Sequence, residues 1–269
     1  MAGVPDPIAA MHRANQAFHA QALDTAPLTC GLAHFSTQFG LIGNQVREVT
    51  IPAGMTVARA YEEVQAFFRG AGAPCRRWTP ALGQPTEELE AFLATRGFVP
   101  KRRTVMALRP WPELPPHPRV RIVPGRAVRQ ALRELLLSDE GLGRTDRREL
   151  VAQMVLSRMD DPGFDMLLAL VDGQPAGQGA LLQAGPIAAI YDVFVRKEHR
   201  RQGVGLAIVA DLVTLCRRLE LRTVVLDVDE ENAAAIGLYE RCGFVRAGSS
   251  VEFVRAAREG EGLGRSTAE

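Results

Sequence analysis

Residues 191–206 read YDVFVRKEHRRQGVGL, and this stretch decides how the second half of the chain folds. Its first residues, apolar, β-branched and aromatic up to Val195, predict a strand. Apolar residues then recur at three- and four-residue steps from Val204 to Leu215, which predicts a helix. A charged loop joins the two and ends in two closely spaced glycines, Gly203 and Gly205. This order of strand, glycine-containing loop and helix is typical of a site that holds a phosphate.

The loop has the composition of an anion site. Glycine lets the backbone approach a ligand closely, and the first N–H groups of a helix lack intrahelical partners and attract anions. Basic side chains precede the glycines, at Arg196, Lys197, Arg200 and Arg201. The Walker pattern is absent, and Ile208 stands where a dinucleotide-binding loop would place its third glycine. The alternative interpretation is a solvated basic loop in front of an ordinary helix.

Length and composition limit the functional classes. The chain has 269 residues, enough for two ordinary domains, and 46% hydrophobic and 23% charged residues, as in soluble globular proteins. A formal net charge of +1 provides no overall basic field for binding nucleic acid. No apolar run is long enough to span a bilayer, and the first residues lack a signal-peptide pattern, so we expect no membrane partner and a cytoplasmic location.

The cysteines do not predict a metal site or a disulfide framework. They are scattered and lack close histidine partners, and we interpret them as ordinary thiols: Cys30, Cys75, Cys216 and Cys242.

A proline-rich segment divides the sequence. Residues 109–119, RPWPELPPHPR, contain five prolines, which neither a helix interior nor a central strand tolerates. We predict a domain over 1–110, a semi-rigid linker over 111–119, a second domain over 120–256 and a disordered tail over 257–269.

The second domain alternates strands and helices. Strands are predicted over 120–123, 165–171, 176–183, up to 195, over 223–228 and over 244–253, and helices over 125–138, 146–159, 204–218 and 233–241. The pair Asp172-Gly173 predicts a hairpin turn. This order predicts an α/β fold with a mixed sheet.

The first half resembles the second at its end. Setting Gly97-Phe98 on Gly243-Phe244 aligns FLATRGFVPKRRTVMAL with LYERCGFVRAGSSVEFV, so each half ends in a helix, a Gly-Phe pair and a strand. Earlier elements in the first half are strands over 46–51 and 104–108 and helices over 56–69 and 86–95. These observations predict a duplicated fold.

A second group of chemically active residues lies in VVLDVDEENAAAIGLYERCGF, residues 224–244. Asp227 closes a strand, Asn232 precedes a helix and Tyr239 lies two turns into that helix. Each has a plain structural alternative: an acidic surface loop, a helix N-cap and a half-buried core residue, respectively.

Together the two stretches resemble the GCN5-related N-acetyltransferase (GNAT) superfamily. The acyl-CoA signature Arg/Gln-x-x-Gly-x-Gly/Ala is matched by Arg200, Gly203 and Gly205. The later signature is matched by Asn232, Ala235, Leu238, Tyr239, Gly243 and Phe244. The run from residue 226 to 244 looks especially like ribosomal-protein alanine N-acetyltransferases, with aspartate at 227 in place of their glutamate.

The resemblance implies roles for these residues. It implies two tandem GNAT-like domains, each a mixed, mostly antiparallel sheet flanked by helices, with splayed central strands in the C-terminal domain. The co-substrate would be acetyl-CoA, with the main chain of Phe194 and Val195 pairing with its pantetheine arm and Asn232 facing that arm. The pyrophosphate would be held by the loop residues Arg200, Arg201, Gln202, Gly203, Val204, Gly205 and Leu206. Tyr239 would protonate the departing thiolate.

The chemistry requires a base as well as an acid. An α-amino group has a reference pKa near 8 and a lysine near 10.4, so the attacking amine must lose a proton. Asp227 is our leading base, acting through water, and Asp192 is the rival if no bulge alters its orientation. Cys242 is the remaining alternative, as an acetyl-accepting thiol, but a structural thiol is the preferred interpretation.

The first half departs from the family pattern. Its strand-to-helix connection, PAGMT at 52–56, lacks the Arg-x-x-Gly-x-Gly pattern, while Leu93 and Thr86 take the places of Tyr239 and Asn232. We therefore expect a degenerate copy that binds no CoA and that covers the sheet edge or shapes the acceptor side.

The resemblance to the GNAT superfamily implies an N-acetyltransferase that moves an acetyl group from acetyl-CoA to a primary amine in a ternary complex. The alternatives are a non-catalytic acyl-CoA-binding regulatory protein and a two-domain acetyltransferase like mycothiol synthase. The amine acceptor, a small molecule or a peptide, and the oligomeric state stay open.

Overall fold

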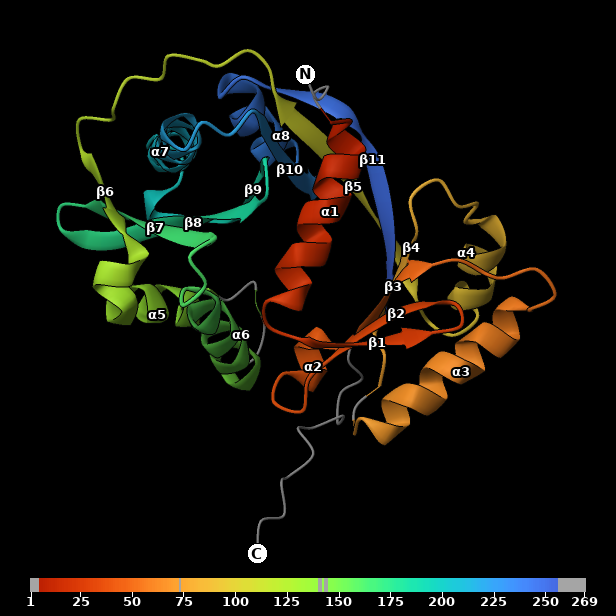
Figure 1. The fold of residues 1–269 in the computed structure, drawn as a ribbon. Coiled ribbons are helices and arrows are strands. Elements are labelled where there is room, and N and C mark those ends of the chain that lie inside the picture. The colour runs from red at the N-terminus through yellow and green to blue at the C-terminus, as the bar shows by residue number, and fades with distance from the viewer. Residues whose placement is uncertain (1–4, 73, 140–141, 143–144, 256–269) are drawn as a thin grey trace, which may run out of the picture. The chain divides into compact units, whose positions relative to one another are not determined.

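The structure is a computed structural model that describes residues 5–72, 74–139, 142 and 145–255 (Figure 1). The predicted tail, residues 257–269, lies outside the described residues. Among the helices of this part of the chain, none has the length and apolar composition needed to cross a bilayer.

The chain forms two compact units that are not consecutive in sequence. The first, called unit 1, comprises the described residues within 5–21 and 103–250, and the second, unit 2, those within 22–102 and 251–255. These units differ from the predicted domains, 1–110 and 120–256, because the first helix and most of a long strand pack with the C-terminal sequence. The boundary between the units follows which strands and helices pack together, and it does not fall at the proline-rich segment.

Unit 1 is a mixed sheet with helices on both faces. Its strands run in the order β11, β5, β10, β9, β8, β7, β6, and β10 pairs parallel with β9 and antiparallel with β5. The remaining pairs, from β9 to β6, are antiparallel. Its elements are α1 (Pro7–Ala20), β5 (Val99–Leu108), β6 (Val120–Pro124), η1 (Gly125–Val128), α5 (Arg129–Leu137), α6 (Thr145–Arg158), β7 (Phe164–Val171), β8 (Gln174–Ala184), β9 (Ile187–Val195), η3 (Lys197–His199), α7 (Val204–Arg218), β10 (Thr223–Asp229), α8 (Ala233–Arg241) and β11 (Phe244–Val254).

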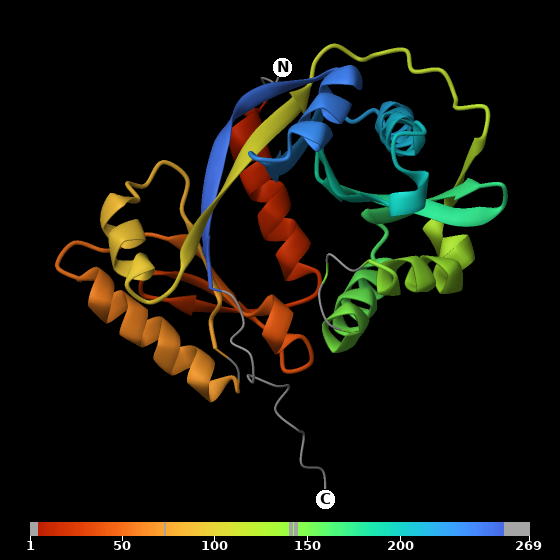
Figure 2. The ribbon, with the colours of Figure 1, turned by 180° about the vertical axis from the view of Figure 1, so that it is seen from behind.

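The side chains of each strand alternate between the two faces of the sheet, and their contacts show which helices cover which face. In β10, Val224 and Leu226 pack in a cluster with residues of α7 and α8, whereas Val225 between them packs with α1. In β8, Leu181 faces α7, and its neighbours Ala180 and Leu182 pack with α5 and α6. Successive side chains of a strand point to opposite faces. Thus α7 and α8 cover one face of the sheet and α1, α5 and α6 the other (Figures 1 and 2).

The two central strands separate after a short contact. Pairing between β9 and β10 is limited to Thr223–Val225 against Ile187–Ala189. From residue 190 on, the edge of β9 that faces β10 pairs with no strand of the described residues. On its other edge β9 carries a bulge against β8, where Asp192 has a φ of 52°. The splayed central strands predicted for the C-terminal domain are therefore present, and the bulge lies at the rival base.

Unit 2 repeats part of this architecture. Its elements are β1 (Asp24–Leu28), β2 (Gly31–Phe35), α2 (Gly40–Gly43), β3 (Gln45–Val49), α3 (Val57–Gly70), β4 (Arg77–Pro80), α4 (Glu87–Ala94) and the ends of β5 and β11. β3 and β4 are parallel, as are β9 and β10, and each pair is joined by a helix.

The aligned Gly-Phe pairs occupy the same structural position in the two copies. Gly97 and Gly243 follow α4 and α8 with φ of 79° and 84°, values that favour glycine after a helix. Phe98 and Phe244 behind them are 2% and 1% exposed. The predicted duplication is confirmed by this order of elements.

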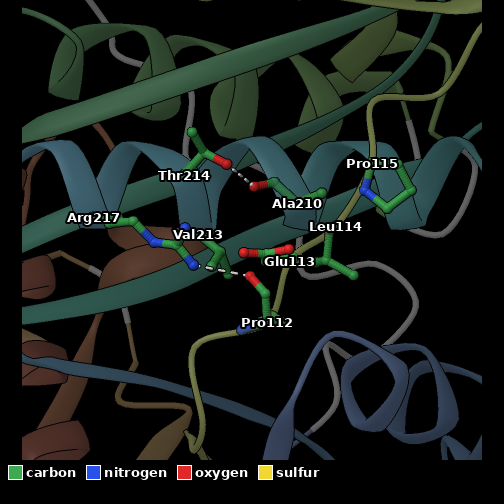
Figure 3. A pocket seen from close by; sticks show the side chains of 8 residues that line it. All are labelled: Pro112, Glu113, Leu114, Pro115, Ala210, Val213, Thr214 and Arg217. Atoms are coloured by element: carbon green, nitrogen blue, oxygen red, sulfur yellow. Dashed lines mark hydrogen bonds between the residues drawn. The ribbon is translucent and has the colours of Figure 1, made fainter.

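The proline-rich segment differs from the predicted linker. It joins β5 to β6 inside unit 1 and lies along α7, where Arg217 Nη2 donates to the carbonyl oxygen of Pro112 at 2.9 Å (Figure 3). We call residues 110–119 the strap. A cavity of about 440 Å³ lies between the strap and α7 and is lined by Pro112, Glu113, Leu114, Pro115, Ala210, Val213, Thr214 and Arg217.

Candidate functional site

The predicted phosphate loop is an open helix terminus. Gly203 is the N-cap of α7, with φ of 81°, and provides no side chain to satisfy the first N–H groups. Ala207 is the first residue of this helix to donate to a loop carbonyl, that of Gly203 at 3.0 Å. The N–H groups of Val204, Gly205 and Leu206 therefore have no intrahelical acceptors. Arg201 also has a positive φ, 61°, and such alternating backbone conformations form concave anion sites.

Side chains of the loop fix its shape. Arg200 Nε donates to the carbonyl oxygen of Val195 at 3.0 Å, and Gln202 Nε2 donates to that of Glu198 at 2.8 Å. Arg201 is exposed. Of the residues predicted to hold pyrophosphate, Arg200 and Gln202 thus stabilise the loop itself, while Arg201 is directed to solvent.

The two glycines serve different purposes. A Cβ at Gly203 would lie 2.8 Å from the His117 ring, and its φ already disfavours other residues. A Cβ at Gly205 would lie 3.1 Å from Leu238 Cδ2, so this glycine allows α7 and α8 to approach closely. The sequence pattern required glycine at both positions, but only Gly203 needs it for the backbone conformation.

The strand side of the site is an open edge. Phe194 and Val195 pair with Gln178 and Gly177 of β8, and both are half-buried. The other edge of β9 faces the gap created by the separation from β10. An extended chain that carries amide groups fits such an edge, because a strand edge presents N–H and C=O groups for pairing.

Helix α8 positions the predicted acid and the predicted pantetheine contact. Tyr239 is 8% exposed, and burial raises the pKa of its hydroxyl to about 12, with Arg103 opposing the shift. Its hydroxyl makes no hydrogen bond within the described part of the chain. Asn232 is exposed and is the N-cap of α8, with Oδ1 accepting from the Ala235 N–H at 3.0 Å. Asn232 therefore acts as the helix N-cap through Oδ1, and its side-chain NH2 group remains available to a ligand.

The two candidate bases have different surroundings. Asp227 Oδ1 accepts from Arg103 Nε at 2.7 Å, Arg103 Nη2 lies 2.5 Å from the same oxygen, and Asn15 Nδ2 lies 3.4 Å from Oδ2. Asp192 is exposed and, within the described residues, makes no hydrogen bond or ion pair. These contacts leave Asp192 as the carboxylate with unused acceptor capacity.

Nearby protein and charge act on Asp192 in opposite directions. Desolvation by the surrounding protein raises the pKa of its carboxyl, and the cations Arg158 and Arg103 lower it. Because Asp192 is exposed, water weakens both effects.

Helix α1 contributes residues that the sequence analysis missed. The Tyr191 hydroxyl donates to Asn15 Oδ1 at 2.9 Å, so Asn15 links Tyr191 to Asp227. The Phe18 ring stacks on Tyr191 with centroids 4.3 Å apart, and the Arg158 guanidinium lies 3.7 Å from the Phe18 centroid on α1. The sequence carries a signal for this helix in Asp6-Pro7, an N-cap followed by proline in the first turn.

The described residues near these groups include no reactive thiol and no metal-binding cluster. Cys242 is fully buried, and burial raises its thiol pKa to about 12, so the structural interpretation of this cysteine is the one that fits. Within the described residues, no cluster of three or more His, Cys, Asp or Glu side chains has a metal-binding arrangement.

Comparison with known proteins agrees with this geometry. Residues 129–244 match the model of the acetyltransferase (GNAT) family. The matched segment, residues 129–244, belongs to the GNAT family. A mycothiol acetyltransferase of Kytococcus sedentarius is 33% identical over 180 residues, which cover 60% of this chain and 59% of that protein. This chain spans less than two thirds of the length of the curated relatives it matches first.

Solved structures share the fold along most of the chain. A GCN5-related N-acetyltransferase from Kribbella flavida has a TM-score of 0.62 at 15% identity, covering 95% of this chain and 97% of the other. A tandem GNAT protein from the clavulanic acid biosynthesis pathway has a TM-score of 0.51 at 19% identity, covering 78% and 74%. At these identities the likeness concerns the fold alone, and it fits a tandem GNAT arrangement.

Proposed function

We propose that this protein transfers the acetyl group of acetyl-CoA to a primary amine. One observation carries the proposal: the open terminus of α7 and the parted edge of β9 lie in the same unit as Tyr239 and two carboxylates. The loop N–H groups fit a pyrophosphate, the open strand edge fits the amides of pantetheine, and the phenol fits a thiolate leaving group.

In the proposed reaction the neutral amine nitrogen bonds to the thioester carbon, the C–S bond breaks and the amine loses a proton. Asp192 or Asp227 accepts that proton through water, and the contacts of Asp227 with Arg103 and Asn15 favour Asp192. Tyr239 donates a hydrogen bond to the departing sulfur. Arg103 lies beside both Asp227 and the phenol and opposes the rise in the tyrosine pKa.

Two observations bear on the acceptor amine: the curated relatives and the carboxylates near the site. The relative from Kytococcus sedentarius is a mycothiol acetyltransferase, so the acceptor of the mycothiol-synthase-like alternative, a cysteine amine linked to a sugar, is the first to test. The exposed carboxylates Glu230, Glu231 and Asp192, together with the half-buried Asp229, favour a cationic amine. A CoA-binding regulatory protein without turnover is the second candidate function, favoured by the occupied carboxylate of Asp227.

Thermal unfolding tests the co-substrate site. We expect acetyl-CoA to raise the melting temperature of the natural protein and Gly203→Glu to abolish this effect, because the new side chain would meet the His117 ring and place a negative charge at the anion site. Gly173→Glu is the matched control, since Gly173 also has a φ of 81° and a Cβ there meets nothing within 4 Å. Equal protection of the Gly203 variant would refute the site.

Turnover distinguishes the enzyme from the binding protein. Mass spectrometry of acetyl transfer to a panel of amines, including peptide N-termini, polyamines and cysteine-linked sugars, is expected to show one acetylated class. Protection by acetyl-CoA with no product from any amine would favour the regulatory protein.

A further inference from the structure

The strap brings an imidazole to the phosphate loop. Nε2 and Cδ2 of His117 both lie 2.8 Å from the position that a Cβ of Gly203 would take. Gly203 is the residue that caps α7 and precedes its open N–H groups. No sequence pattern links His117 to this loop, because the two positions lie far apart along the chain.

The local contacts of His117 define which nitrogen donates. The backbone N–H of Arg119 donates to His117 Nδ1 at 3.3 Å, so Nδ1 acts as an acceptor. In a neutral imidazole one nitrogen accepts and the other carries the proton. The tautomer that fits this contact carries its proton on Nε2, the atom that lies beside Gly203.

The strap has contacts on both sides of His117. Four prolines within residues 112–118 restrict the backbone, and Arg217 of α7 binds the Pro112 carbonyl oxygen and lies 5.7 Å from the Trp111 ring centroid (Figure 3). On the other side of His117, Arg119 forms an ion pair with Asp172 at 3.0 Å. A restricted backbone at His117 reduces the conformational freedom that is lost when its side chain binds a ligand.

Three cations near the loop are engaged with protein oxygens, whereas Arg201 is exposed. Arg200 Nε donates to Val195, Arg196 Nε donates to Ser138 Oγ at 3.2 Å, and Arg119 pairs with Asp172. His117 Nε2 is a side-chain nitrogen that lies beside the residue that starts the anion site. An imidazole N–H is a good partner for a phosphate oxygen, since hydrogen bonds to charged acceptors are the stronger ones.

We propose that His117 binds the pyrophosphate of acyl-CoA, with Nε2–H donating to an oxygen that the N–H groups of Val204, Gly205 and Leu206 also contact. The inference rests on the proposed function and adds a residue from the strap to its co-substrate site. It makes the strap a wall of the acyl-CoA site in addition to a connection between β5 and β6.

Two substitutions of the full chain separate the proposed contact from the integrity of the strap. His117→Asn keeps an oxygen near Nδ1 to accept from Arg119 but removes the Nε2 donor. His117→Gln extends an amide N–H toward the Nε2 position. Calorimetric titration with CoA is expected to show about tenfold weaker binding for His117→Asn and nearly natural binding for His117→Gln. Dephospho-CoA, which keeps the pyrophosphate and lacks the 3′-phosphate, is expected to show the same tenfold loss.

Each other outcome is informative. Natural protein that binds no CoA would overturn the proposed function and this inference together. Binding by the natural protein with equal affinity in His117→Asn would overturn the inference alone. Tighter binding by His117→Asn would do so as well, because the ring would then occupy the phosphate position. A loss confined to CoA, with dephospho-CoA unaffected, would move the contact to the 3′-phosphate and overturn the pyrophosphate assignment.

Discussion

Substitution of Tyr239 by phenylalanine tests how the departing sulfur is stabilised. Burial raises the pKa of this phenol to about 12, whereas a thiol has an ordinary pKa of about 8.5. Complete proton transfer from Tyr239 to the thiolate is then uphill by about 3.5 units, or about 5 kcal/mol at 1.36 kcal/mol per unit. The phenol therefore acts by donating a hydrogen bond to the sulfur, with the proton staying largely on oxygen.

The magnitude follows from that role. A hydrogen bond to a charged acceptor contributes about 1.5 to 3 kcal/mol, so Tyr239→Phe is expected to lower kcat by about 10- to 150-fold. The edge-to-face contact with Phe244, at a centroid distance of 6.0 Å, needs only the ring. Affinity for acetyl-CoA and the melting temperature are therefore expected to stay close to those of the natural protein.

Steady-state kinetics with the best amine of the panel, together with calorimetry of acetyl-CoA binding, measures both quantities. Tyr61→Phe is the control, because this tyrosine packs on Trp78 within unit 2 and its variant should keep full activity. A fall in kcat of less than threefold for Tyr239→Phe, or a change confined to KM, would refute the reasoning. With the pKa near 12, we also expect no loss of kcat at pH 10 from ionisation of this phenol.

Three further predictions concern buried groups. Burial and the nearby Arg47 lower the pKa of His34 from 6.5 to about 4. Because the unfolded chain takes up the proton first as the pH falls, the free energy of unfolding should decrease by up to about 3 kcal/mol between pH 6.5 and pH 4. Urea unfolding of His34→Gln should therefore show a weaker dependence on pH. The Arg158 guanidinium is 2% exposed and makes no hydrogen bond in the described part of the chain, so Arg158→Met should leave the melting temperature unchanged or raise it; a clear decrease would contradict this. A thiol reagent at pH 8 should label the native protein at none of its four cysteines and the unfolded protein at all of them, because each is buried and burial raises its pKa: Cys30, Cys75, Cys216 and Cys242.

The elements of unit 1 were predictable because their periodicity is strong. The predicted helix 204–218 coincides with α7, and the predicted strand 223–228 is one residue shorter than β10. The turn at Asp172-Gly173 has positive φ at both residues, as a two-residue hairpin turn requires. Residues 191–206 contain both the strand end and the helix start, so local sequence sufficed to predict the loop.

Other features depend on contacts between distant parts of the chain. The proline content of residues 109–119 correctly excluded a helix or a central strand, but the same stiffness suits a strap held against α7 by Arg217. Helix α1 belongs to unit 1 because Ala10, Met11 and Ala14 are buried against its sheet, and no pattern within residues 7–20 specifies that partner. The engagement of Asp227 with Arg103 likewise follows from the pairing of β10 with β5, where Asp229 lies opposite Arg103.

The duplicated fold offers a physical reason for placing the chemistry in unit 1. In unit 2 the helix that corresponds to α7 is α3, and its N-cap is Thr56, whose Oγ1 accepts from the N–H of Arg59 at 3.2 Å. In unit 1 the N-cap is Gly203, which has no side chain to accept from the helix. A helix terminus whose N–H groups are satisfied by a cap offers fewer donors to an anion. With the leucine at 93 fully buried in the position of Tyr239, these differences support the expectation that unit 2 binds no CoA.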